Sequence, residues 1–231
     1  MHVVRGSLAE TERDRRVTRR LADLVERTGR PAVRAWTPPR QVAFGRRDAS
    51  ADGYDRARRA AVGRDYRPVE RRVGGRAVAY TGATVAVVHG VPADGDRTDI
   101  QGRYERGADR LRTALESVGA AVRPGEPSAS FCPGDHSLQS DGKIAGIAQR
   151  VQRAVALVGG CAVVAETDER DIADVLEPVY DALGVAFDPA SVGSVAGAGG
   201  PADPERVVDA IERTFVGDRE PTPVDAPELL S

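Results

Sequence analysis

Apolar residues recur every three or four positions in several segments of the chain, which is the spacing of one face of an α-helix. In residues 9–28 the apolar side chains that share such a face are Val17, Leu21, Leu24 and Val25. The same pattern predicts further helices over residues 48–61, 101–118, 168–183 and 204–215. Asp203 followed by Pro204 is typical of a helix start, because the carboxylate caps free N–H groups and proline suits the first turn.

Short apolar runs bounded by turn-forming residues predict β-strands between these helices. They lie at residues 3–4, 33–36, 42–44, 83–88 and 155–164. Two glycines at 159–160 are expected to interrupt the last of these runs. The Asp-Gly turn at 141–142 predicts a hairpin between residues 137–138 and 144–149.

The alternation of these elements predicts an α+β fold, in which a mixed β-sheet is covered by packed helices. With 231 residues, 41% of them hydrophobic, the chain is long enough to bury a core. Residues 1–215 are expected to form a single domain, with Trp36 in its core or in a pocket wall. Residues 216–231 are rich in proline and acidic side chains, which predicts a flexible tail.

Charge and composition narrow the classes of partner. The formal net charge of −2 argues against a nucleic-acid partner. The sequence has no run of about 18 apolar residues and no apolar leader, so no membrane association is expected. Two cysteines, Cys132 and Cys161, are too few for a disulfide framework and favour a cytoplasmic location, with Cys161 in the core. The three His and two Cys lack the spacing of a metal site, so no metal is expected.

Lys143 is the only lysine of the chain, although Lys and Arg together number 33. The chain also has no Asn, a pattern typical of a bias against AT-rich codons, which converts replaceable lysines to arginines. Lysine carries a compact ammonium that can approach a single atom, whereas arginine is a planar fork. We therefore interpret Lys143 as a functional residue, with chance survival on a hairpin turn as the alternative.

Two adjacent glycines flanked by arginines form a second candidate site, at residues 71–76. Without Cβ atoms, Gly74 and Gly75 let backbone N–H groups approach a phosphate or carboxylate closely. Arg71 and Arg76 supply bidentate donors for the same anion. A simple turn is the alternative, because arginine is common throughout this chain.

Cys132 lies in a Pro-Gly turn, where backbone N–H groups can face its sulfur. Positive charge on His136 or Lys143 would favour the thiolate if these residues lie near. An inert buried cysteine is the alternative.

Further along, Gly146 and Ala148 alternate with larger residues, as expected where a thin substrate lies against a strand. Close packing within the sheet is the alternative for these two small residues.

Together and in this order, these stretches resemble the family of lipoate–protein ligases and octanoyl- and lipoyl-transferases. Residues 71–78 are similar to the family's Arg-x-(Ser/Thr)-Gly-Gly-(Gly/Arg)-Ala-Val loop. Residues 142–149 are similar to its Gly-(Arg/Lys)-Lys-(Ile/Val)-(Ala/Ser)-Gly-(Ser/Ile)-(Ala/Ser)-Gln stretch. Residues 34–36 and 39–45 resemble the strands that precede the loop in that family, and the likeness covers residues 3–185.

Within the family, residues 131–134 upstream of the lysine resemble the cysteine-dependent transferase branch. The resemblance implies the fold shared by biotin and lipoate protein ligases, and transfer of an octanoyl or lipoyl group to a lysine of an acceptor domain. Cys132 would carry the acyl group as a thioester, and Lys143 would hold the acyl carbonyl. The residues that would contact the substrate are Arg71, Gly74, Gly75, Arg76, Gly146 and Ala148.

The implied partners are a lipoyl-domain or glycine-cleavage-H-type acceptor and, as the donor, an acyl-carrying protein or free lipoate. The transferase hypothesis requires no cofactor. The first alternative is an ATP-dependent lipoate–protein ligase that acts through lipoyl-AMP and uses ATP and Mg²⁺. Less favoured hypotheses are a non-catalytic paralogue and a carrier module in which Lys143 is itself modified. Carrier domains are short all-β units, whereas this chain is predicted to contain several long helices.

Overall fold

The computed structural model describes residues 1–71, 75–93, 99–152 and 154–231. Its strands are β1 (His2–Arg5), β2 (Ala32–Trp36), β3 (Gln41–Phe44), β4 (Arg67–Glu70), β5 (Val78–Tyr80), β6 (Val85–Pro92), β7 (Arg123–Pro124), β8 (Ser137–Gln139), β9 (Lys143–Gln152), β10 (Val155–Ala162) and β11 (Thr222–Asp225). Its helices are α1 (Thr11–Thr28), α2 (Arg46–Ala49), α3 (Tyr54–Val62), α4 (Ile100–Ser117), α5 (Glu166–Ala182) and α6 (Pro204–Val216), with short 3-10 helices η1 (Pro189–Ser191) and η2 (Glu228–Leu230).

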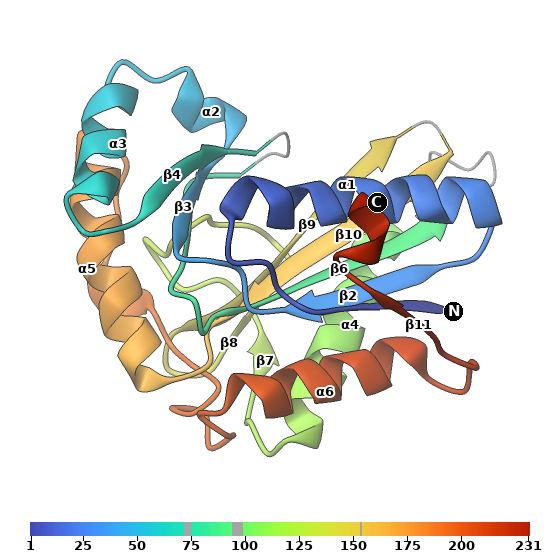
Figure 1. Cartoon of the computed structure of the whole chain (residues 1–231). Helices are drawn as coiled ribbons and strands as arrows, with labels where there is room; N and C mark the ends of the chain where they lie inside the picture. The colour runs from blue at the N-terminus through green and yellow to red at the C-terminus, as the bar shows by residue number, and fades with distance from the viewer. Residues whose placement is uncertain (72–74, 94–98, 153) are drawn as a thin grey trace.

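The strands form two sheets (Figure 1). The larger has the order β11-β1-β2-β6-β10-β9-β8-β7, and the smaller has the order β4-β3-β5. In the large sheet β1 runs parallel to both of its neighbours, whereas the pairs from β2–β6 onward are antiparallel. Mixed sheets with helices on their faces confirm the predicted α+β class.

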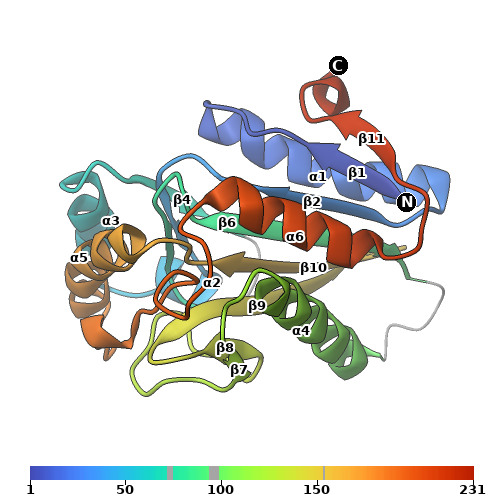
Figure 2. The same ribbon diagram turned by 90° about the horizontal axis from the view of Figure 1, so that it is seen from below.

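Helices cover both faces of the large sheet. α1 crosses one face, and α4 and α6 lie against the other (Figure 1 and Figure 2). Val17, Leu21 and Val25, from the predicted apolar stripe of α1, are fully buried. α1 packs closely over Gly90 of β6, where a Cβ would lie 3.0 Å from side-chain atoms of Leu21 and Val25. No helix in the described ranges is long and apolar enough to cross a membrane.

The single helix predicted over residues 48–61 is instead broken into α2 and α3. The carboxylate of Asp48 turns back to accept a hydrogen bond from the N–H of Gly45 (3.2 Å), which caps the start of α2. Between the two helices, Gly53 lies so close to α5 that a Cβ on it would be 1.7 Å from the carbonyl oxygen of Ala182. The break therefore reflects packing against α5, which helical periodicity does not reveal.

Two predictions about the strands have different outcomes. β8 and β9 pair across the Asp-Gly turn, which confirms the hairpin. The predicted interruption of the apolar strand is wrong, because β10 continues through Gly159 and Gly160, opposite Val88 and Val87 of β6. The two glycines keep their backbone pairing but face opposite sides of the sheet. A Cβ on Gly160 would lie 3.5 Å from the side chain of Leu111 in α4, whereas a Cβ on Gly159 would meet only backbone oxygens, so Gly159 leaves room on the other face.

The residues predicted to form a flexible tail instead extend the large sheet. Thr222–Asp225 pair in parallel with His2–Arg5, and the N–H of Thr222 donates to the carbonyl of Met1 (2.8 Å). Ala226 is fully buried, and η2 packs against α1 (Figure 1). The expectation is therefore wrong for this segment, because its proline-rich composition does not reveal pairing with a strand at the other end of the chain.

Candidate active site

The β8–β9 hairpin places Lys143 at the start of β9, directly after the turn. A Cβ on the preceding Gly142 would lie 2.7 Å from the carbonyl carbon of Val192. Glycine therefore lets the segment that follows η1 cross the turn, where the N–H of Gly193 donates to the carbonyl of Lys143 (3.0 Å). With this cover, Lys143 is only 1% exposed and is not a solvated turn residue.

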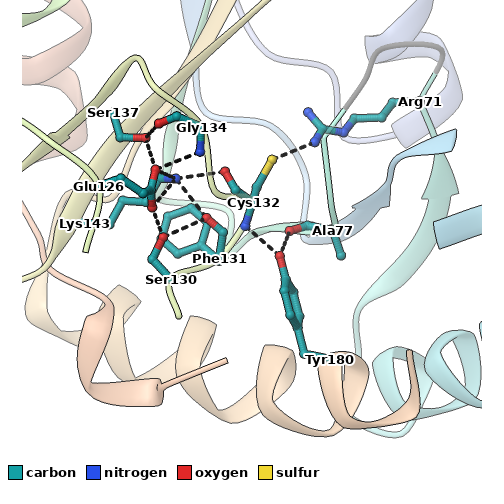
Figure 3. A network of polar contacts seen from close by, with 10 residues as sticks. All are labelled: Arg71, Ala77, Glu126, Ser130, Phe131, Cys132, Gly134, Ser137, Lys143 and Tyr180. Atoms are coloured by element: carbon teal, nitrogen blue, oxygen red, sulfur yellow. Dashed lines mark hydrogen bonds and ion pairs between the residues drawn. The ribbon is translucent and has the colours of Figure 1, made fainter. Parts of the chain in front are cut away.

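The ammonium of Lys143 is surrounded by oxygen atoms (Figure 3). It lies 3.1 and 2.9 Å from the two carboxylate oxygens of Glu126. It also lies 2.9 Å from each of the carbonyl oxygens of Phe131 and Cys132. Because a buried lysine without a counter-charge is costly, Glu126 stabilises the ammonium in this position. The result is a fixed positive charge in contact with the backbone of Cys132.

Cys132 has a backbone conformation that few residues other than glycine adopt, with φ at +43°. Its N–H donates to the hydroxyl of Tyr180 (2.6 Å), which in turn donates to the carbonyl of Ala77 (3.0 Å). Its carbonyl accepts from Lys143, and its sulfur accepts from the guanidinium of Arg71 (3.1 Å). Such conformations persist only where surrounding contacts hold them, and they cluster at active sites.

The predicted double-glycine loop lies against this thiol. Gly75 has φ at +88°, and a Cβ on it would lie 2.7 Å from the sulfur of Cys132 and 2.9 Å from the guanidinium of Arg71. Glycine is therefore required at this approach. Arg71 also donates to the carbonyl of Arg76 (2.6 Å), so one guanidinium joins the loop to the sulfur. Gly74 lies outside the described residues.

The two cysteines of the site region have different surroundings, and only Cys132 has a cation, Arg71, in contact with its sulfur among the described residues. Burial opposes the charge on Arg71, yet Cys132 and Tyr80 beside it raise its pKa above the ordinary value. Cys161 differs, because burial raises the pKa of its thiol to about 11. Cys161 therefore stays protonated at neutral pH, and Cys132 is the candidate nucleophile.

Lys143, Cys132 and Arg71 all line one cavity of about 440 Å³. The other walls come from α1, from β6, β9 and β10 of the large sheet, and from β3 and β5 of the small sheet. Small and apolar residues of these walls include Ala43, Val78, Ala86, Val87, Val88, Gly146, Ile147, Ala148, Leu157, Gly159 and Gly160. Gly146 and Ala148, which were expected to contact a substrate, are thus in the lining, and Gly75 is too.

Three other residues singled out in the sequence have different surroundings. The guanidinium of Arg76 donates to the fully buried carboxylate of Asp48 (3.1 Å), so a direct contact with substrate stays a prediction. His136 stacks on Tyr104, with ring centroids 4.5 Å apart. Trp36 was expected either in the core or in a pocket wall, and it lies in the wall of this cavity. Among the described residues, no group of His, Cys, Asp and Glu is arranged to hold a metal ion.

Sequence reasoning missed Glu126 and Tyr180, which complete the polar site. Burial would raise the pKa of the Glu126 carboxyl, but its hydrogen bonds lower that pKa below the ordinary value. The donors are Ser130, Ser137, Lys143 and the N–H of Gly134. A buried lysine needs an acidic partner, so the sequence could suggest that one exists. The chain has 35 acidic residues, however, and no spacing rule identifies which of them pairs with Lys143. Tyr180 follows the core periodicity of α5, so nothing in the sequence marks its hydroxyl.

Curated proteins similar to this chain include two enzymes named octanoyl-[GcvH]:protein N-octanoyltransferase. Those from Geobacillus kaustophilus and Exiguobacterium sp. are 33% and 32% identical to it over 132 residues. The matches cover 57% of this chain and 45% of each enzyme, so the chain spans about half the length of the curated relatives it matches.

Solved structures show the same fold. Lipoate-protein ligase A bound with ATP matches with a TM-score of 0.77 at 16% identity, over 99% of this chain and 91% of that one. Ta0514 from T. acidophilum with bound lipoic acid matches with a TM-score of 0.71 at 16% identity, over the same shares. In a comparison with family models, residues 14–216 match the lipoyl protein ligase A/B catalytic domain. The chain therefore belongs to the lipoyl protein ligase A/B catalytic domain family, as its motifs indicated.

Proposed function

We propose that this protein transfers an octanoyl or lipoyl group between proteins through a thioester on Cys132. The observation that carries the proposal is the position of Cys132 in the cavity lining, with its sulfur in contact with the guanidinium of Arg71 and its backbone carbonyl bound by the ammonium of Lys143. The family supports this activity, and so does the similarity to enzymes named as octanoyltransferases.

The reaction takes place in two steps at one sulfur. The thiolate of Cys132 attacks the carbonyl carbon of the acyl donor, the bond from that carbon to the donor's heteroatom breaks, and the donor group leaves with a proton. The neutral amine of an acceptor lysine then attacks the thioester and forms an amide, and its proton passes to solvent. The sulfur leaves as thiolate, and the enzyme returns to its starting form.

Lys143 supplies positive charge for the oxyanion that forms in each step. Its ammonium lines the cavity and already contacts four oxygen atoms. An acyl oxygen that enters beside it replaces one of those contacts. A preorganised donor of this kind typically contributes about 2.7–4 kcal/mol to lowering the barrier.

The cavity walls suit an unbranched acyl chain. Four residues of the lining are small: Gly146 and Ala148 of β9, and Gly159 and Gly160 of β10. No bulky side chain projects from these four positions. Aliphatic side chains such as Val87 line the cavity as well. Burial of each CH₂ group of an acyl chain contributes about 0.8 kcal/mol, which favours a fatty-acyl substrate over a short acid.

The proposed acceptor is a lipoyl domain or a glycine-cleavage-H-type protein, and the proposed donor is a protein that carries the acyl group. One relative is named for octanoyl-[GcvH], which supports the donor assignment. The transferase reaction uses no ATP, whereas a ligase of this family would use ATP and Mg²⁺. A free Cys132 is needed throughout, which suits the reducing cytoplasm expected from the two unpaired cysteines.

The test is acyl transfer from octanoylated H-type carrier protein to a purified lipoyl domain, with and without ATP. We expect transfer without ATP, and a hydroxylamine-sensitive octanoyl adduct on Cys132 in intact and peptide mass spectra. Cys132→Ser should form no hydroxylamine-sensitive adduct, while the exposed control Glu26→Gln should behave as wild type. No adduct, together with ATP-dependent release of pyrophosphate, would show that the protein is a ligase instead.

A further inference from the structure

The loop from Glu126 to Ser137, here called the cysteine loop, is held together by a single carboxylate. We propose that Glu126 is a positioning residue that sets the geometry of both Cys132 and Lys143 for acyl transfer. This inference rests on the proposed function, because it assigns a role within that reaction. It concerns a residue in a loop without periodic pattern, outside the motifs that carry the family resemblance.

Four donors converge on the carboxylate of Glu126 (Figure 3). They are the hydroxyls of Ser130 and Ser137, the N–H of Gly134 at 2.9 Å, and the ammonium of Lys143. Ser130 lies before Cys132 in the chain, and the other three donors lie after it. The carboxylate therefore closes the cysteine loop on both sides of the nucleophile.

Glu126 also acts on Cys132 through Lys143. The ammonium that Glu126 binds donates to the carbonyls of Phe131 and Cys132, both at 2.9 Å. Cys132 has a left-handed backbone, which is unfavourable for a residue with a Cβ and depends on its neighbours. Loss of the carboxylate would release Lys143 and both halves of the loop together, so the sulfur would no longer be held toward Arg71.

These four partners of the Glu126 carboxylate are all donors, so the position requires an acceptor with two oxygens. Glutamine has the same size, but its amide NH₂ would face donors, and it carries no charge to balance Lys143. Aspartate keeps the charge and both oxygens but is one methylene shorter. Glu126→Gln should therefore have the larger effect, and Glu126→Asp a partial one.

The release of the cysteine loop can also be observed without acylation. The N–H of Gly134 is held by the carboxylate of Glu126 (2.9 Å), and the N–H of Cys132 is held by the hydroxyl of Tyr180 (2.6 Å). Glu126→Gln removes the charge that binds the N–H of Gly134 and the ammonium of Lys143. Amide hydrogen exchange across the cysteine loop should therefore be faster in this variant.

The experiment compares wild type, Glu126→Gln, Glu126→Asp and the exposed control Glu26→Gln. Acylation of Cys132 by octanoylated carrier protein is measured in single turnovers across carrier concentrations. Amide hydrogen exchange of the cysteine loop is measured at a single pH by peptide mass spectrometry. For Glu126→Gln we expect a maximal acylation rate about 100-fold lower, with little change in the carrier concentration at half-maximum, because small misplacement of a reacting group has effects of this size.

Hydrogen exchange of the cysteine loop should be faster in Glu126→Gln, and Glu26→Gln should match wild type in both assays. A wild-type acylation rate in Glu126→Gln, or unchanged hydrogen exchange of the loop, would overturn the proposal. If Glu126→Gln fails to fold, Glu126→Asp must show the smaller loss of acylation, and a wild-type rate there overturns the proposal equally. If the wild-type protein itself is never acylated, the transferase function fails, while hydrogen exchange still decides whether Glu126 holds the cysteine loop.

Discussion

Two ion pairs are buried beside the same cavity, and they are built for different purposes. In one, Arg34 is 0% exposed and its partner Asp14 is 2% exposed. In the other, Lys143 is 1% exposed but its partner Glu126 is 22% exposed. Both side chains of the arginine pair are almost fully buried, although Asp14 also belongs to the cavity lining, whereas the lysine pair has an accessible partner, Glu126, and its lysine lines the cavity.

The arginine pair connects α1, which carries Asp14, to β2, which carries Arg34. The guanidinium of Arg34 reaches the carboxylate of Asp14 at 2.5 Å, the backbone carbonyl of Asp14 at 3.2 Å and the carbonyl of Gly6 at 2.8 Å. It also lies over the ring of Trp36 at 4.1 Å, and the indole N–H donates to Asp14 (2.9 Å). Such a planar fork with several donors suits a joint between two elements.

The lysine pair holds a point charge against the backbone of the candidate nucleophile. The ammonium of Lys143 lies 5.0 Å from the ring centroid of Phe131, farther than Arg34 lies from the ring of Trp36. It bonds instead to the backbone carbonyl of the candidate nucleophile, Cys132. In a chain that uses arginine almost everywhere, this contrast supports the proposal that Lys143 is retained for its function. The two residues can be exchanged experimentally to test whether stability and activity separate.

The largest expected effect is on stability, from Asp14→Ala. The substitution leaves the guanidinium of Arg34 buried without its counter-charge, which typically costs about 3–5 kcal/mol in the free energy of unfolding. Urea unfolding at neutral pH measures the loss. Asp23→Ala is the matched control on the same helix, because Asp23 pairs with Arg20 at the surface and should matter by less than about 0.5 kcal/mol. Equal losses for the two variants would contradict the assigned role.

Lys143→Arg should have the next largest effect, and on activity. The guanidinium is wider than an ammonium, and little room remains beside Gly146, where a Cβ would lie 3.3 Å from the Cε of Lys143. The charge is kept but moved, so we expect acyl transfer to fall by about 10²–10³-fold, equal to about 2.7–4 kcal/mol. The fold should be kept, as judged by circular dichroism. Full transfer activity would remove the argument that a lysine is required.

Arg34→Lys is the reverse exchange and should have a smaller effect, on stability alone. An ammonium cannot make the forked contacts to Asp14 and Gly6 or stack on Trp36, and the expected loss is about 1–3 kcal/mol in unfolding free energy. Acyl transfer below the unfolding transition should change little, because Arg34 is not among the described residues that line the cavity. A large loss of transfer in a folded Arg34→Lys protein would mean that the two pairs are coupled.

The parts of this molecule that depend on local sequence were predictable. Asp203 caps α6 through the N–H of Glu205 (2.9 Å), and the hairpin that carries Lys143 follows its Asp-Gly turn. β11 was not predictable, because four residues near the end of the chain pair with a strand that begins at His2. Its composition indicates a tail, and only the long-range backbone pairing makes it a strand.

The candidate site divides in the same way. Lys143, Cys132, Arg71 and Gly75 were singled out by residue type and neighbours, and the structure brings them into contact. Glu126 could not be found, since its importance comes from donors that meet only after the cysteine loop has folded. Arg76 was singled out with its loop, but its guanidinium turns to Asp48, a direction that no motif specifies.

The smallest expected effect is the loss of stability at low pH, when the accessible carboxylate of Glu126 in the lysine pair becomes protonated. Burial raises the pKa of Glu126, but hydrogen bonds from Ser130, Ser137, Lys143 and Gly134 outweigh it and hold the pKa below the ordinary 4.5. A carboxyl whose pKa is lower in the folded state contributes stability above the unfolded pKa and loses it as pH falls through the folded one. The difference in unfolding free energy between wild type and Glu126→Gln should therefore be constant near neutral pH. It should narrow as pH falls below about 4.5, in urea titrations taken at successive pH values. A difference that stays constant down to the acid unfolding transition would show that the carboxylate charge does not hold the lysine pair together.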